Sequence, residues 1–259
     1  MKPPRKDNRQ PQHEPRQPRE RTMIESGTRY PNESADYRRS RNELLGAELE
    51  ARRAIERAAE LRRRLPLGGE IPEDYEFTTT DPEGKVDRIR MSALFKPDQN
   101  TLLLYSFMFG PDMDAPCPSC ASILDALDGE LPHLEQRVSF AAVIRSPIER
   151  VVSLISARGW RHLRVVSSEG TSYNHDYHGE DGDGSQQPTM NVFEKNGDGI
   201  FHLWGAEEAP SDPGQEPRNL DLFWPLWHLL DLTREGRGGE GFPRLWYDGY
   251  DESPEPAKS

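Results

Sequence analysis

Both cysteines of this chain stand in one short motif, Cys117-Pro118-Ser119-Cys120. The motif follows the apolar run 101–107 and a Gly-Pro turn, so the local order is a strand, a short loop and a CxxC motif that opens a helix. A helix N-terminus presents unpaired N–H groups and roughly half a positive charge, which favour a thiolate over a thiol. We therefore expect Cys117 to be a nucleophile and Cys120 to be its resolving thiol, and Pro118 suits the first helical position.

Three other interpretations of the cysteine pair remain open. A structural disulfide would close a very small loop in a chain with an ample core. A zinc site needs two more ligands, and none of His133, His175, His178 and His202 stands at finger-like spacing. The third alternative is a buried and inert CxxC pair. We expect redox chemistry, with no metal and no cofactor.

Composition indicates where such a pair would work. Hydrophobic residues make up 34% of the 259 residues and the mean hydropathy is −0.87, which is enough for one good core with disordered ends. No run approaches the roughly 18 apolar residues of a membrane span, and no apolar signal segment opens the sequence. We therefore expect a cytoplasmic protein without membrane contact, whose cysteines rest as a dithiol.

Charge is distributed unevenly along the chain. The net charge is −12, but residues 1–40 carry ten Lys or Arg against six acids, whereas nineteen acids face six bases after residue 168. An acidic body repels phosphate backbones, which argues against nucleic-acid binding by the folded part. The basic, proline-rich segment 1–40 is too poor in apolar residues to fold, and we expect a disordered tail there.

The central region predicts one domain over residues 41–250. Apolar and small residues recur every three or four positions from Arg41 to Leu65, which predicts an amphipathic helix. Its alanine-rich stripe packs either on the same chain or on a second copy in a homodimer. A hairpin over 75–91 should follow, and then strand 101–107, helix 117–127, strand 138–144, helix 148–158 and strand 163–167.

Strands that alternate with helices indicate parallel pairing with right-handed crossovers. The segments 190–194 and 200–204 flank Asn196-Gly-Asp-Gly199, an excellent hairpin turn, and so add an antiparallel edge. Parallel strands followed by a hairpin predict a thioredoxin-like three-layer α/β/α sandwich with a mixed sheet. A helix over 220–230 and an aromatic cluster over 242–250 should dock on it as a C-terminal extension, with a disordered end at 251–259.

Several short motifs together resemble a known family. They are Tyr105-Ser-Phe-Met-Phe-Gly-Pro111, the CxxC motif, Arg145-Ser-Pro147, Gly159-Trp160, Ser167-Ser168, Tyr173-Asn-His-Asp176 and the run from Leu230 to Arg237. The chain resembles, over about residues 40–250, a bacterial family catalogued as a domain of unknown function and grouped with thioredoxin-like proteins. This resemblance implies a thioredoxin-like fold with a long N-terminal helix and a C-terminal extension, and it implies no activity. The stretch 160–168 lacks a proline, and thioredoxins use a cis-proline to position peptide substrates, which argues against protein disulfides as substrates.

Residues outside the motif complete the candidate site. Arg145 follows a core strand, and His175 beside Asp176 could shuttle protons if their loop folds over the sheet end. We expect a thiol–disulfide oxidoreductase whose partners are a disulfide or oxidised-thiol substrate and an unidentified reductant. A peroxiredoxin-like peroxide reductase is one alternative, although Asp114 and Gly110 replace the hydroxyl residue and the proline that its motif needs. A binding module that uses the thioredoxin fold without catalysis is another.

Overall fold

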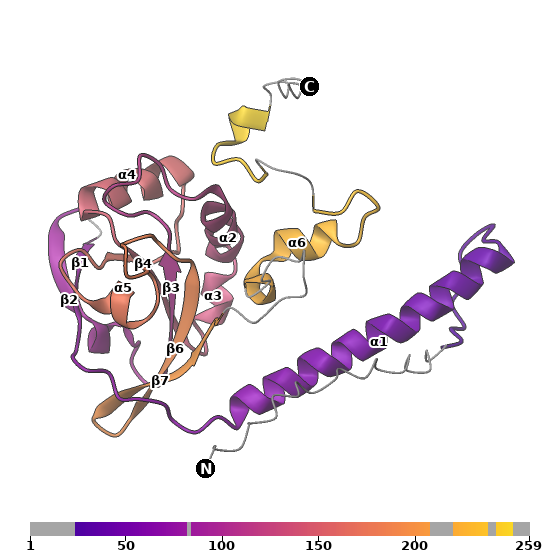
Figure 1. Ribbon diagram of the computed structural model, residues 1–259, viewed down its shortest axis with the longest axis horizontal. Coiled ribbons are helices and arrows are strands. Elements are labelled where there is room, and N and C mark those ends of the chain that lie inside the picture. The colour runs from indigo at the N-terminus through magenta and orange to yellow at the C-terminus, as the bar shows by residue number, and fades with distance from the viewer. Residues whose placement is uncertain (1–23, 82–83, 208–219, 238–241, 251–259) are drawn as a thin grey trace, which may run out of the picture. The chain divides into compact units, whose positions relative to one another are not determined.

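The computed structural model describes residues 24–81, 84–207, 220–237 and 242–250. The chain divides into two compact units, residues 1–64 and residues 65–259. The first unit contains one long helix, α1 (Ala35–Arg63), which appears in violet in Figure 1. The second unit contains the sheet and the cysteine motif.

The helix α1 starts earlier than the sequence pattern predicted. It begins at Ala35 and not at Arg41, because the hydroxyl of Ser34 accepts a hydrogen bond from the N–H of Tyr37 and so satisfies a free donor of the first turn. Arg38 Nε also donates to the Glu33 carboxylate at 2.7 Å. The helix therefore extends into the segment that we expected to be a disordered tail. Both ends of the chain, residues 1–23 and 251–259, lie outside the described residues.

The second unit is built on one mixed sheet of seven strands in the order β2-β1-β5-β4-β3-β6-β7 (Figure 1). The strands are β1 (Glu76–Thr80), β2 (Val86–Arg90), β3 (Thr101–Phe107), β4 (Ser139–Ile144), β5 (Val165–Ser167), β6 (Thr189–Asn196) and β7 (Gly199–Gly205). The predicted hairpins form from β1 with β2 and from β6 with β7.

Strand directions identify the fold. The neighbours β3, β4 and β5 run parallel, and the crossovers between them are α2 (Pro118–Asp128) with the short α3 (Leu131–Leu134), and then α4 (Ile148–Arg158). The strand β6 pairs antiparallel with the other side of β3. A parallel β3–β4 pair beside the β6–β7 hairpin, with the CxxC helix after β3, is the thioredoxin-like arrangement. The predicted α/β class with a mixed sheet is therefore confirmed.

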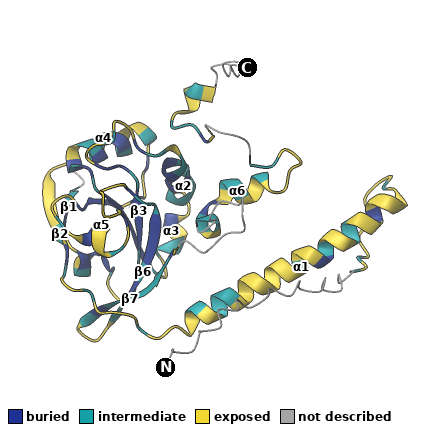
Figure 2. Cartoon of the chain, viewed as in Figure 1, coloured by how far each residue is buried: buried dark blue, intermediate teal, exposed yellow. Residues whose placement is uncertain are grey.

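Each face of the sheet carries its own apolar cluster. In Figure 2 the strands at the centre of the sheet are dark blue, the colour of buried residues. Alternate side chains of β3 separate the clusters: Tyr105 and Phe107 join α2 and α4 on one face, whereas Leu102 and Leu104 point to the other. The second face is covered by a 3-10 helix, η1 (Met91–Leu94), and by the four-residue α5 (Tyr173–Asp176), elements that the sequence analysis missed. The helical layer on this face is consequently thin.

The C-terminal segment packs on the α2 face, as predicted, but its helix is shorter than expected. It consists of η2 (Asp221–Phe223), α6 (Pro225–Leu230) and η3 (Tyr247–Tyr250). Trp224 has an extended backbone because a residue before proline disfavours the helical region, so one continuous helix over 220–230 cannot form. The Trp224 indole N–H donates to Ser122 on α2 at 3.2 Å. Within the described ranges, no helix combines the length and the apolar character needed to cross a membrane.

Candidate functional site

Cys117 caps the N-terminus of α2. Its backbone N–H donates to the carbonyl of Met108 at 3.0 Å, and its own carbonyl accepts from the N–H of Ala121 at 3.0 Å. Pro118 follows in the first turn, where the missing N–H of proline breaks no helical bond. Both cysteines are free thiols; Cys117 is half-buried, whereas Cys120 is only 1% exposed. Of the two sulfurs, Cys117 is therefore the accessible one.

The pKa values of the two thiols are shifted in opposite directions. A hydrogen bond from the Cys120 thiol lowers the pKa of Cys117 to about 6; burial opposes this shift, and the N–H groups of Cys120 and Ser119 add to it. The Cys117 side chain makes no aligned capping hydrogen bond to the first turn of α2. The N–H groups therefore act on the sulfur through their partial positive charge. Burial, and then the Cys117 sulfur, raise the pKa of Cys120 well above its ordinary value. At neutral pH Cys117 is therefore a thiolate, and Cys120 keeps its proton.

Tyr105 on β3 lies beside this pair. Its side chain is fully buried in the same apolar cluster as Cys120. The Tyr105 hydroxyl has no aligned hydrogen-bond partner among the described residues, yet it lies close enough to the Cys120 sulfur for each group to shift the pKa of the other. The backbone N–H of Met108 faces the same sulfur. The sequence analysis missed Tyr105, although a tyrosine on the α2-facing side of the strand that precedes the motif was a usable signal.

Arg150 on α4 holds the loop between β3 and Cys117. Its guanidinium donates to the carbonyl of Gly110 at 3.3 Å, to that of Pro111 at 3.0 Å and to that of Met113. The same guanidinium lies 4.3 Å from the centre of the Phe109 ring. Charge-assisted hydrogen bonds to several carbonyls fix the backbone of this loop. This role was not predictable from the sequence, because nothing in the pattern distinguishes Arg150 from other helical arginines.

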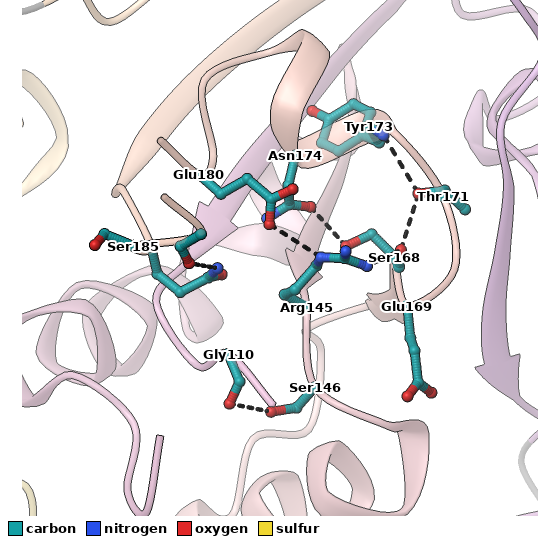
Figure 3. Close-up of polar contacts among 12 residues, drawn as sticks. Gly110, Arg145, Ser146, Ser168, Glu169, Thr171, Tyr173, Asn174, Glu180 and Ser185 are labelled. Atoms are coloured by element: carbon teal, nitrogen blue, oxygen red, sulfur yellow. Dashed lines mark hydrogen bonds and ion pairs between the residues drawn. The ribbon is translucent and has the colours of Figure 1, made fainter. Parts of the chain in front are cut away.

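Arg145, which we expected to support the cysteines, has other partners (Figure 3). Its Nε lies 3.0 Å from the Glu180 carboxylate, and a second nitrogen donates to the carbonyl of Ser168 at 3.3 Å. No described contact joins it to a cysteine. The next residue, Ser146, reaches the loop before the motif instead, since its hydroxyl donates to the Gly110 carbonyl at 3.0 Å. Arg145 therefore fastens the segment that follows β5.

His175 and Asp176 also lie apart from the cysteines. They end α5, which packs into the cluster on the sheet face opposite to Cys120. Burial acts to raise the pKa of Asp176, but hydrogen bonds from Ser172 and Tyr75 outweigh it and lower that pKa below its ordinary value. The His175 side chain is 70% exposed. The structure does not support the predicted proton shuttle, because the chain after β5 passes to the other face of the sheet.

A proline does stand where the antiparallel strand begins. The sequence analysis looked for it between residues 160 and 168, but the strand beside β3 is β6, and Pro188 directly precedes it. Among the described peptide bonds the cis one is Phe242–Pro243, so the bond before Pro188 is trans.

A cavity of about 620 Å³ lies on the same side as α5. Its lining includes the carboxylates of Glu70, Asp176, Asp181 and Glu207, together with the ring of His202. Burial lowers the pKa of His202, whose Nε2 lies 2.9 Å from an oxygen of Asn191. Neither cysteine lines this cavity. The cysteine pair therefore lies elsewhere, at the N-terminus of α2.

Residues 27–253 match the family described as bacterial protein of unknown function, DUF899, and the chain belongs to this family. The match confirms the resemblance noted from the short motifs. No curated protein matches the sequence.

Three solved structures are among those to which this chain is similar. Thioredoxin peroxidase I of Plasmodium yoelii is 14% identical, with 70% of this chain and 98% of that chain covered and a TM-score of 0.42. The reduced 2-Cys peroxiredoxin of Plasmodium vivax is 16% identical, with 63% and 97% covered and a TM-score of 0.42. A secreted disulfide oxidoreductase of Mycobacterium tuberculosis is 16% identical, with 59% and 95% covered and a TM-score of 0.34. Similarity at this level does not identify an activity.

The lowered pKa of Cys117 predicts the pH at which this thiol reacts. Because the thiolate is the reactive form, the rate of alkylation by iodoacetamide should be high above pH 6 and fall as the pH drops through a midpoint of about 6. An ordinary cysteine has its midpoint near pH ~8.5. Cys120→Ala should raise the midpoint, since it removes the donating thiol, whereas Ser153→Ala on the exposed face of α4 should not. A wild-type midpoint near that of an ordinary cysteine would contradict this account of the site.

The hydrogen bonds of Arg150 predict a loss of stability on a conservative change. Lysine carries the same charge but cannot reach several carbonyls with a planar fork, so Arg150→Lys should lower the free energy of unfolding by about 1–2 kcal/mol. Urea unfolding measures the change. Arg161→Lys is the matched control, because the exposed Arg161 is held through its backbone N–H to Asp128. Equal stabilities of the two variants would rule out this role for Arg150.

Proposed function

We propose that this member of the DUF899 family is a thiol–disulfide oxidoreductase. The observation that carries the proposal is the position of the pair at the start of α2, where the accessible Cys117, whose pKa is lowered, stands three residues before the buried thiol of Cys120. A thiolate is the form of cysteine that attacks disulfides, and a second thiol within reach resolves the mixed intermediate. The CxxC geometry supports both requirements.

The reaction would proceed in two exchanges. In the first, the Cys117 thiolate attacks one sulfur of a substrate disulfide, an S–S bond to Cys117 forms, and the other half of the substrate leaves as a thiolate. In the second, Cys120 loses its proton and attacks the Cys117 sulfur, which releases the remaining half. The protein then holds an internal disulfide, and the substrate has gained two electrons. A reductant of the thiol class returns the protein to its dithiol form.

Two other functions make different demands on the site. A peroxide reductase would use the same thiolate, but Asp114 stands where a hydroxyl should bind peroxide. A binding module without catalysis needs no lowered cysteine pKa. The proposed cytoplasmic location, the reductant and a homodimer formed through the alanine-rich stripe of α1 remain predictions. The proposal for the reaction rests on the cysteine pair alone.

Trapping the intermediate tests the proposal. Incubated with glutathione disulfide, the Cys120→Ser variant should accumulate one glutathione on Cys117, because no thiol remains to resolve the adduct. Intact-mass spectrometry would show this single addition. The wild-type protein should pass on to the internal disulfide, which has no added glutathione.

The reciprocal variant is the control. In Cys117→Ser the remaining thiol is buried and keeps its proton, so no adduct should form in the same time. The proposal fails if Cys120→Ser stays unmodified, or if both variants take up glutathione at the same rate.

A further inference from the structure

The second exchange of the proposed reaction presents a physical difficulty. Cys120 must become a thiolate in order to attack, yet its sulfur is buried among apolar side chains. A charge in such a place is costly unless a polar group stabilises it. The site must therefore supply a donor to the Cys120 sulfur at the moment when its proton leaves.

Tyr105 carries a group suited to this need. Its hydroxyl is buried and has no aligned partner among the described residues, which is rare in a folded protein and calls for an explanation. Tyr105 and Cys120 belong to the same buried cluster, and the Cys120 sulfur raises the pKa of this hydroxyl further, after burial. The ring is held from the other side by Phe223, whose centre lies 5.8 Å away in an edge-on arrangement. Packing thus holds the hydroxyl inside the cluster that contains this sulfur, and no hydrogen bond among the described residues occupies its proton.

We propose that Tyr105 is a catalytic residue of the second exchange, in which its hydroxyl donates a hydrogen bond to the Cys120 sulfur as the thiolate forms. This proposal rests on the oxidoreductase function proposed above and extends it. The backbone N–H of Met108 faces the same sulfur and supplies a second donor. Together these two donors would lower the cost of a thiolate in an otherwise apolar core.

The step balances without any further reactant. The proton of Cys120 passes to the substrate thiolate released in the first exchange, or to water. The Cys120 thiolate then forms an S–S bond with Cys117, and the bond between Cys117 and the second half of the substrate breaks. That half leaves as a thiolate with the electron pair of the broken bond. Tyr105 keeps its own proton throughout, since burial and the neighbouring cysteines raise its pKa well above the ordinary value.

Ellman's reagent, an aromatic disulfide, resolves the two exchanges because each releases one coloured thiolate. Tyr105→Phe keeps the ring and its contact with Phe223 and removes only the hydroxyl. The first release, which reports on Cys117, should keep the wild-type rate. The second release should be slowed by about tenfold, as expected when a hydrogen bond to a charged group is lost. The pH midpoint of the second phase should rise, a change that a purely structural role would not produce.

Tyr173→Phe is the matched control. Its hydroxyl is also buried without an aligned partner, but it belongs to the cluster on the opposite face of the sheet. This variant should leave both phases unchanged. If Tyr105→Phe releases both equivalents at the wild-type rates, the role of Tyr105 is refuted while the oxidoreductase function stands. If the wild-type protein releases no second equivalent from Cys120, the oxidoreductase function itself fails.

Discussion

The interaction between the two thiols of the CxxC motif is the one on which the proposed chemistry depends. With the proton on Cys120, its thiol stabilises the thiolate of Cys117, and the N–H groups at the start of α2 act in the same direction. The interaction exists only while the first turn of α2 keeps both sulfurs on one side. The loop that leads into this turn is fastened by Arg150, and the helix itself is fastened by the apolar cluster beneath it. The position of the motif thus depends on contacts from α4 and from the core beneath α2.

The difference in burial between the two cysteines decides which sulfur a substrate can reach. If both thiols were equally exposed, only the N–H groups at the start of α2 would favour Cys117 as the nucleophile. Because Cys120 lies in the core and Cys117 at its edge, the accessible sulfur is also the one with the lowered pKa. The C-terminal segment contributes to this difference, since Phe223 and Trp224 close the cluster around α2. The acidic cavity beside α5 lies on the other face and takes no part in it.

Local patterns predicted the elements that carry the cysteines. The strand over 101–107 and the helix over 148–158 have the predicted bounds, because alternation and helical periodicity in these segments agree with their burial. Contacts between distant segments were not predictable in the same way. His175 looked like a partner of the cysteines because it follows a strand of the same sheet, and no local signal shows to which face the chain turns after β5. Arg150 and Tyr105 acquire their roles only when α4 and β3 meet the loop and the helix of the motif. The early start of α1 is different, since the Ser34 cap was visible in the sequence and was overlooked.

The central claim is that Cys117 and Cys120 form one redox couple. A titration in glutathione buffers of graded potential, with free thiols counted per chain after acid quenching, measures this directly. The account predicts that both thiols disappear together in a single two-electron transition between roughly −300 and −120 mV, the span of known redox dithiols, and that Cys117→Ser shows no such transition. A pair that keeps both thiols over this whole range would contradict the account.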